Sequence, residues 1–422
     1  MSWGSPQREQ LRVLLLLIAI NFINYVDRQI VFPLFPFIRK DFGLTFLQLG
    51  SLATAFTLVL SLGSLPLGML ADRTSRKRVI RAGVLIWSVA TFLSGLSGSF
   101  RWLLGARAMV GVGEAAYTPA GTAIISGTFS RELRARVQGL FDLGMFAGGA
   151  VGIALGGIFA QWLGWRAAFF IVGVPGLILA LLVGRLPEPP RVAVRKTMRV
   201  QELFRVPAYL MLLASGWFAS FAGYAYVAWG PELVQDYKGF SSSQAGLALA
   251  VIVVVAGLSG IATGAALSDR LARRFTWGRI SMVPVGFLLS VPLSLIALHA
   301  SNRAAFLIAF ALSVYFLSWY HGPVTATIHD LIPAQGHATA MGLYYFFVNF
   351  FAMALAPLLI GGIADHSNLL SAMHAAVVAQ AIGGGLFLGV IYFIRRDGLV
   401  AGRVAPTPAE IELPGGTAET AS

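Results

Sequence analysis

The chain has 422 residues, of which 57% are hydrophobic and only 12% are charged. A soluble protein of this length cannot bury so much apolar surface in one core, so the composition excludes an ordinary soluble protein and favours one embedded in lipid. The absence of cysteine excludes disulfide bonds and thiolate metal sites.

Twelve segments along the chain are largely apolar over roughly 20 residues, the length that a helix needs to cross a bilayer. The first begins near Leu11 without a small-residue cleavage site, so we expect a retained helix and not a removed signal peptide. The sequence therefore predicts an all-α membrane protein. The predicted segments are 11–34, 46–70, 79–98, 101–127, 136–161, 166–186, 207–235, 243–268, 278–300, 303–328, 337–363 and 371–394.

The polar connector 187–206 divides these segments into two sets of six. We expect an N-terminal half at 1–186 and a C-terminal half at 207–394. The segment 395–422 is rich in Pro, Gly, Thr and Glu, which predicts a disordered tail.

A weak internal repeat supports this division. Leu70–Arg73 reads LADR after the second segment, and Leu267–Arg270 reads LSDR after the eighth, 197 residues later. Gly156–Ile158 and Gly361–Ile363 both read GGI, at an offset of 205 residues. Duplicated halves are the organisation expected of many secondary transporters.

The basic residues predict the orientation in the membrane. With the N-terminus in the cytoplasm, 23 of the 31 Lys and Arg residues fall in cytoplasmic segments and 6 in outer loops, while Arg28 and Arg107 lie inside helices. Cytoplasmic loops of membrane proteins carry such an excess of Lys and Arg. We therefore expect a protein of a bacterial inner membrane with both termini on the cytoplasmic side. This placement also explains the net charge of +13 without a nucleic-acid partner.

The loop after the second segment combines a glycine, an acid and a basic cluster. It resembles the signature loop of the major facilitator superfamily, and the alternative is a loop that is merely basic. The glycine permits close helix approach, and the acid can pair with an Arg or accept from a helix N-terminus. We expect these residues, and their second-half counterparts, to act in gating: Gly68, Asp72, Arg73, Arg76, Lys77, Asp269 and Arg270.

Charged side chains inside the predicted membrane segments are the main functional signal. Asn24, Asp27 and Arg28 lie in the first segment, and Arg107 and Glu114 lie seven residues apart on one face of the fourth. Each such charge costs about 2.5–3.5 kcal/mol to insert and indicates function by default. We expect Asp27 and Glu114 to compete for Arg28 and Arg107, so that protonation changes the pairing. A static structural ion pair is the alternative.

We expect a set of mostly aromatic residues inside the predicted segments to line the central cavity. Whether His321 or Asp142 takes part in proton coupling stays open. In the fifth segment Gly144, Gly148, Gly152 and Gly156 recur at every fourth position, which predicts a close-packing seam. The predicted cavity-lining residues are Tyr117, Tyr224, Trp229, Trp319, Tyr320, His321 and Asn349.

Several short motifs resemble the spinster-type branch of the major facilitators, among them Tyr25–Arg28, Gly111–Tyr117 and Gly164–Arg166. The anion:cation symporter branch is similar in the same places. The resemblance implies proton coupling at Asp27 and Glu114. Animal spinsters move sphingosine phosphate or lysophospholipids, so it also implies an amphiphilic anion as substrate.

We therefore expect a proton-coupled secondary transporter of a lysolipid-like amphiphile, working by alternating access. A symporter of organic or sugar acids and a proton-independent facilitator are the alternatives. The sequence contains no P-loop and no catalytic or metal-binding pattern, so we expect neither an enzyme nor a cofactor or metal. The expected partners are the substrate, protons and membrane lipids, and the expected state is a monomer.

Overall fold

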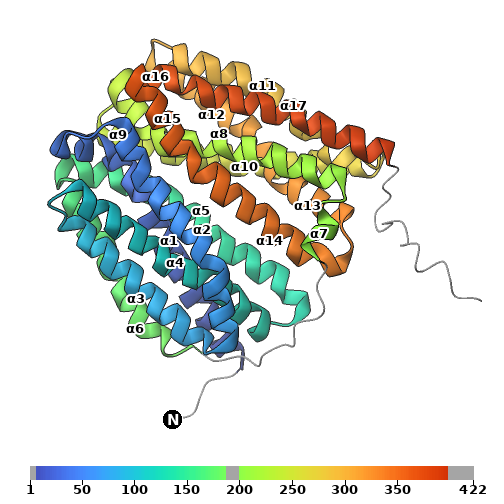
Figure 1. Ribbon diagram of the computed structural model, residues 1–422, viewed down its shortest axis with the longest axis horizontal. Coiled ribbons are helices and arrows are strands. Elements are labelled where there is room, and N and C mark those ends of the chain that lie inside the picture. Colours follow the sequence, from blue (N-terminus) through green and yellow to red (C-terminus); the bar gives the residue numbers. More distant parts are fainter. Residues whose placement is uncertain (1–5, 187–198, 398–422) are drawn as a thin grey trace, which may run out of the picture.

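The computed structural model describes residues 6–186 and 199–397. Within these ranges the chain is helical and contains no strand. Figure 1 shows two groups of helices, one from each half of the chain, that lie side by side at an angle. The predicted tail falls almost entirely outside the described residues, as does most of the predicted connector.

The N-terminal half consists of six long helices. They are α1 (Pro6–Phe42), α2 (Phe46–Arg73), α3 (Arg76–Gly95), α4 (Phe100–Thr128), α5 (Arg131–Trp162) and α6 (Trp165–Val183). The predicted first segment ended at 34, whereas α1 continues to Phe42 with Pro33 and Pro36 inside it. The two prolines do not end the helix.

In the C-terminal half, three of the six membrane segments contain a short irregular turn that sequence periodicity did not predict. The elements are α7 (Val200–Leu203), α8 (Pro207–Lys238), α9 (Ser242–Ile252), η1 (Val253–Gly257), α10 (Leu258–Ala272), α11 (Gly278–His299), α12 (Arg303–Leu317), η2 (Ser318–Tyr320), α13 (His321–Leu331), η3 (Ala334–Gly336), α14 (His337–Phe347), η4 (Val348–Met353), α15 (Leu355–His366), α16 (Leu369–Ala372) and α17 (His374–Arg396). The π-helical turns η1 and η4 and the 3-10 turn η2 each interrupt a membrane segment that is otherwise α-helical.

Among the described residues, eleven helices are long and apolar enough to cross a membrane. The twelfth long helix, α4, has 29 residues and carries the charges that mark the site below. The all-α membrane fold with twelve long segments is therefore confirmed.

Local sequence signals start the second helix of each half in the same way. At the start of α2 the Thr45 hydroxyl accepts from the backbone N–H of Gln48, and the Gln48 side-chain oxygen accepts from the backbone N–H of Thr45. Ser241 and Gln244 do the same for α9. Such capping boxes satisfy backbone N–H groups that a helix start leaves free. The matching caps agree with the internal repeat.

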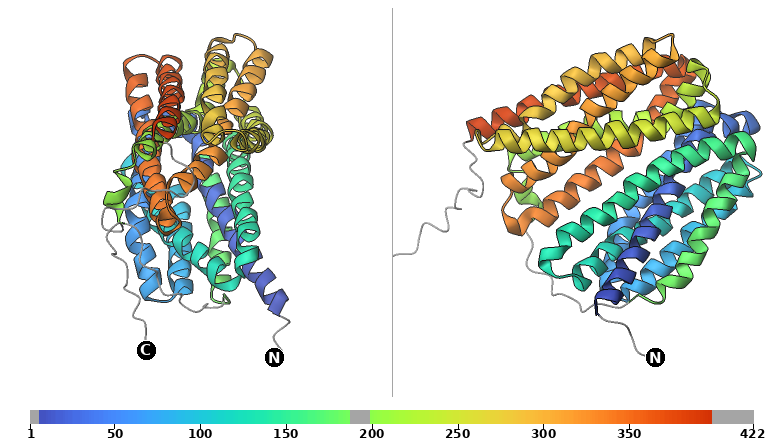
Figure 2. Two further views of the ribbon diagram at one scale, coloured as in Figure 1. Left: turned by 90° about the vertical axis from the view of Figure 1, so that its right-hand side faces the viewer. Right: turned by 180° about the vertical axis from the view of Figure 1, so that it is seen from behind.

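The two halves pack against each other at one end of the molecule. We call it the closed end and define it by the loops 43–45, 96–99, 163–164, 239–241, 300–302 and 367–368. Small residues allow this contact: a Cβ at Gly246 of α9 would lie 2.7 Å from the carbonyl oxygen of Ile153 in α5. Thr54 of α2 donates a hydrogen bond of 2.6 Å to the Ala354 carbonyl. Toward the other end the two groups of helices diverge (Figures 1 and 2).

Candidate functional site

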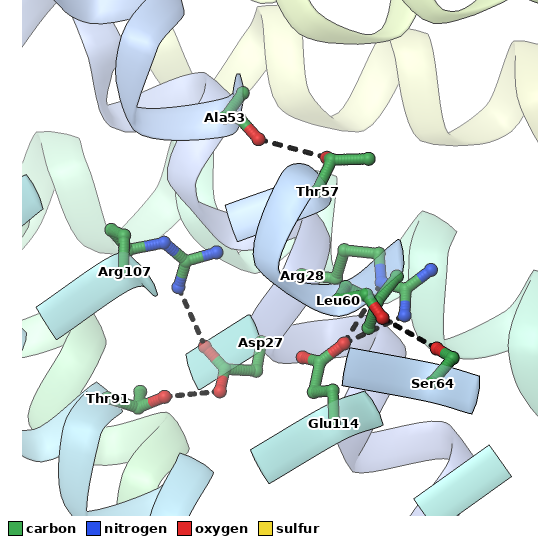
Figure 3. A network of polar contacts seen from close by, with 9 residues as sticks. All are labelled: Asp27, Arg28, Ala53, Thr57, Leu60, Ser64, Thr91, Arg107 and Glu114. Carbon is green, nitrogen blue, oxygen red and sulfur yellow. Dashed lines mark hydrogen bonds and ion pairs between the residues drawn. The ribbon is translucent and has the colours of Figure 1, made fainter. Parts of the chain in front are cut away.

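Four charged side chains from α1 and α4 meet in the middle of the N-terminal half as two separate ion pairs (Figure 3). Arg28 contacts Oε2 of Glu114 through Nη2 at 2.8 Å and through Nε at 3.2 Å. Arg107 Nη1 lies 3.3 Å from Oδ1 of Asp27. The four charged residues that the sequence predicted to interact therefore do lie together, but each acid pairs with a different arginine.

The two pairs differ in how they are enclosed. Asp27 also accepts a hydrogen bond from the hydroxyl of Thr91 on α3, so both of its oxygens are engaged. The side chains of Asp27 and Arg107 are 2% and 1% exposed, whereas 15% of the Arg28 side chain is exposed. The Asp27–Arg107 pair is therefore shielded from solvent, whereas the Arg28–Glu114 pair is partly accessible through Arg28, on the side that faces the other half.

Aromatic rings flank both guanidinium groups. The Phe56 ring of α2 contacts both, with its centroid 5.3 Å from the Arg28 carbon Cζ and 5.2 Å from that of Arg107. Arg28 also lies over the ring of Tyr25 at 4.5 Å. Such cation–π contacts stabilise a guanidinium without neutralising it, so they leave its charge available for an anion.

Some polar atoms of the site have no hydrogen-bond partner among the described residues. They are both amide atoms of Asn24, Oε1 of Glu114 and Nε of Arg107. Buried polar groups are normally paired, so atoms of this kind mark places where water or a polar ligand group can bind. Asn24 lies one turn before Arg28 on α1, which puts it on the same side of the helix.

The C-terminal half covers this cluster with Tyr224 of α8. The hydroxyl of Tyr224 lies near that of Thr57 of α2, and the Tyr224 ring packs edge-on against Phe32 of α1 at a centroid distance of 5.9 Å. Trp229, five residues further along α8, is fully buried and packs against Phe35 and Phe46 of the N-terminal half. Tyr224 and Trp229 thus belong to the contact between the halves on the side of the closed end.

The other predicted cavity residues are divided between the packed interior and the space between the halves. Tyr117 is fully buried and donates a hydrogen bond of 2.7 Å to the Leu17 carbonyl, so it lies in the core of the N-terminal half and not at a cavity wall. Trp319 and Tyr320 are likewise buried within the C-terminal half. His321 is exposed, and half-buried Asn349 lies in η4, which packs against α2 and α8.

The predicted gating residues lie at the end opposite to the closed end, away from the charge cluster. Asp72 pairs with Arg76 at 3.4 Å within its own loop. In the second half Asp269 lies 3.7 Å from Arg279, which also pairs with Asp330 at 2.8 Å. A Cβ at Gly68 would lie 3.3 Å from Pro119 of α4, which agrees with a glycine at a close helix contact. Arg73, Lys77 and Arg270 lie in the same two loop regions.

Sequence reasoning missed a third buried acid, Glu232 of α8. It is fully buried and pairs with Arg39 of α1, which comes from the other half of the chain. A usable signal was present, because Glu232 is an acid inside the predicted segment 207–235. Thr91 and Thr57 were also missed, since a threonine inside an apolar helix carries no distinctive pattern.

The chain has no group of three or more His, Cys, Asp or Glu side chains suited to a metal ion in the part that the structure describes.

The family model "Major Facilitator Superfamily" matches residues 17–278. Among curated relatives, an MFS-type efflux pump of Mycolicibacterium smegmatis is 28% identical, with 88% of this chain and 87% of the relative covered.

Two further relatives match the resemblance that the motifs suggested. Protein spinster homolog 1 of Xenopus laevis is 27% identical over 93% of this chain and 83% of its own length. A hexuronate transporter of Bacillus subtilis is 25% identical over 96% of this chain and 98% of its own.

A crystal structure of a bacterial homologue of the human lysosomal transporter Spinster, inward-facing and occupied, has the same fold. It aligns with a TM-score of 0.85 at 24% identity and covers 96% of this chain and 100% of its own. The predicted resemblance is therefore confirmed, and the relatives are transporters and not enzymes. The chain belongs to the Major Facilitator Superfamily and is a multi-pass membrane transporter.

Proposed function

We propose that this transporter couples the movement of an anionic substrate to protons, by alternating access between its two halves. The observation that carries the proposal is the Arg28–Glu114 pair. Ionised Glu114 neutralises Arg28, whereas a protonated Glu114 leaves the guanidinium free to pair with an anion. Proton and anion then bind together, which favours symport over antiport.

Asp27 is proposed as the second coupling acid. Its carboxylate lies close enough to that of Glu114 for the two to repel each other. Because repulsion falls when either acid is neutral, a proton on Glu114 favours the ionised form of Asp27 with Arg107. The cluster can therefore carry one proton at a time while Arg107 stays paired.

For the substrate we favour a lysolipid-like amphiphile. Arg28 would bind the anionic head group, with the amide of Asn24 supplying polar contacts. The aromatic rings of Tyr25 and Phe56 beside Arg28 suit an apolar body. The spinster relative supports this choice. A sugar acid is the second candidate, which the hexuronate transporter among the relatives supports, and a proton-independent facilitator is the third.

The closed end is proposed to face outward, because the basic loops gather at the opposite end. In that orientation both termini are cytoplasmic and the molecule faces inward, with the signature loops at the cytoplasmic entrance. We propose the cell membrane as its location, the segments 1–186 and 207–394 as its two moving units, and a monomer as the working form.

The test is transport into proteoliposomes with and without a pH gradient, using a fluorescent lysophospholipid in one arm and labelled glucuronate in the other. Glu114→Gln mimics the protonated acid, so we expect it to abolish accumulation while exchange across the membrane continues. Arg28→Gln should abolish both.

Asp142→Asn is the matched control, because Asp142 is an intramembrane acid that bonds Gln138 outside the cluster. It should accumulate substrate as the unmodified protein does. Full accumulation by Glu114→Gln would refute coupling at Glu114, and loss in Asp142→Asn alone would move the coupling site to Asp142. Equal flux with and without the pH gradient in the unmodified protein would leave the facilitator as the function.

A further inference from the structure

The closed end contains an ion-pair cluster whose members come from both halves. Arg39 near the end of α1 lies 2.8 Å from Oε1 of Glu232 and donates a hydrogen bond of 2.8 Å to Oδ2 of Asp236, one turn further along α8. Arg39 also lies over the Phe46 ring at 4.5 Å. Because α1 and α8 belong to different halves, opening this end must separate Arg39 from both acids.

Glu232 is the unusual member of this cluster. Its side chain is 0% exposed, whereas those of Arg39 and Asp236 are 31% and 33% exposed. Oε1 of Glu232 is engaged only by the ion pair with Arg39, and Oε2 has no hydrogen-bond partner among the described residues. A single guanidinium serves two carboxylates, so the cluster with both acids ionised has a net charge of −1.

Other charged or titratable groups at this end have partners of their own. Asp365 of α15 accepts hydrogen bonds from the first backbone N–H groups of α2. Lys238 of α8 donates to the carbonyls of Leu298 and Ala300, and His374 of α17 contacts the Leu370 carbonyl. Arg39 is therefore the cation that compensates Glu232 in the closed arrangement.

We propose that Glu232 is a proton-binding site of the gate at the closed end, and that its protonation favours closure. Closing the end moves the carboxyl from water into a buried position, which disfavours the charged form. The buried charge of Glu232 can be compensated by the ion pair with Arg39, but Arg39 also pairs with Asp236. Alternatively, a proton can neutralise Glu232. The closed population should therefore rise as the pH falls.

This inference rests on the proposed alternating access but not on the role of Glu114. It gives the cycle a second proton step, in which an acid that faces the outer medium when the gate is open takes up a proton before the gate shuts. The substrate site lies deeper in the molecule, so the two proton sites can be tested separately.

The distance between the two halves at the closed end reports on the gate without any substrate. The natural chain has no cysteine, so spin labels can be attached to Gly98→Cys and Ser301→Cys, which are exposed in closed-end loops of opposite halves. A side chain at Gly98 meets nothing within 4 Å. Double electron–electron resonance in nanodiscs, at mildly acidic and mildly alkaline pH, then gives the closed and open populations.

Arg39→Gln leaves Glu232 buried without a cation, so we expect the ratio of closed to open molecules at alkaline pH to fall roughly tenfold or more. Acid should restore closure in this variant. Glu232→Gln and the double variant Arg39→Gln/Glu232→Gln should be closed at both pH values.

Arg166→Gln is the matched control. Arg166 lies at the same end and pairs with Asp41 at 2.6 Å, but both belong to the N-terminal half and are about 40% exposed. Its populations should equal those of the unmodified protein. Arg39→Gln that stays closed at alkaline pH, or Glu232→Gln that keeps the pH dependence, would overturn the proposal.

The same series in the Glu114→Gln background separates this inference from the proposed function. Unchanged pH dependence there supports Glu232 as the site. If the dependence disappears with Glu114→Gln and persists with Glu232→Gln, the proton acts at Glu114, and the inference fails while the proposed function stands. Should Glu232→Gln not fold, the pH series of the unmodified protein and of Arg39→Gln still decides the question.

Discussion

Each half contains a buried polar cluster, and the two clusters differ in charge although their members on the first and third membrane helices lie at corresponding positions. In the N-terminal half the cluster is Asp27 of α1, Thr91 of α3 and Arg107 of α4. In the C-terminal half Tyr226 of α8 and Ser290 of α11 each lie 199 residues after their counterparts, Asp27 and Thr91.

The C-terminal cluster is neutral and centred on Gln380 of α17. Gln380 accepts hydrogen bonds from Tyr226 at 3.1 Å and from Ser294 at 3.2 Å, and it donates one to Ser290. The Ser294 hydroxyl lies 2.6 Å from that of Ser313 on α12.

Comparing the clusters separates two uses of buried polarity. The neutral network ties four helices together and gains nothing from a change of pH. In the charged cluster a proton can neutralise Asp27, and the neighbouring Arg28–Glu114 pair reaches toward the contact between the halves. We therefore propose that the N-terminal half carries the chemistry of transport and that the C-terminal network has a supporting role.

The strongest way to break this comparison is to remove one charge from the N-terminal cluster. Arg107→Met leaves Asp27 ionised and buried, which should lower the free energy of unfolding by about 3–5 kcal/mol. Thermal unfolding in detergent measures the effect. The double variant Asp27→Leu/Arg107→Met removes both charges and should recover most of the loss. If the single variant melts like the unmodified protein, the pair is not what holds α1 against α4.

The contact between the first and fifth helices also differs between the halves. In the N-terminal half α5 presents glycines to α1, and a Cβ at Gly152 would lie 2.6 Å from the carbonyl oxygen of Val26, next to Asp27. In the C-terminal half the hydroxyl of Tyr209 on α8 donates a hydrogen bond of 2.8 Å to the Ala340 carbonyl on α14.

Gly152→Ala should therefore push α5 away from α1 and lower the free energy of unfolding by about 1–3 kcal/mol, the usual range for overpacking. Gly149→Ala is the control, because its Cβ would meet Gln29 Cγ at an ordinary 3.6 Å. Equal melting temperatures for the two variants would show that the glycine seam is not needed for close packing.

The sequence predicted the twelve helical segments and the four charged residues of the site, because apolar length and intramembrane charge are both local signals. It did not predict that Asp27 would pair with Arg107 and Glu114 with Arg28. Which arginine pairs with which acid depends on how α1 and α4 are rotated about their axes. That rotation is set by the packing of these helices against α2, α3 and α5.

Aromatic residues were harder to place for the same reason. Tyr117 and Trp229 both lie inside membrane helices, yet one packs in the interior of a half and the other at the contact between halves. Composition does not distinguish these faces. Glu232 was overlooked although the rule that identified Glu114 applies to it equally.

The smallest expected effect comes from the neutral network. Gln380→Leu removes hydrogen bonds to three hydroxyl groups, but a hydrogen bond between membrane helices contributes on average only about 0.6 kcal/mol and at most about 1.7. We expect a small drop in melting temperature and an unchanged dependence of transport on the pH gradient. Leucine preserves side-chain volume better than alanine would, so the loss reports the polar contacts and not a cavity. A variant that folds but no longer responds to the gradient would place the C-terminal cluster in the proton pathway, and the division of roles between the halves would then be wrong.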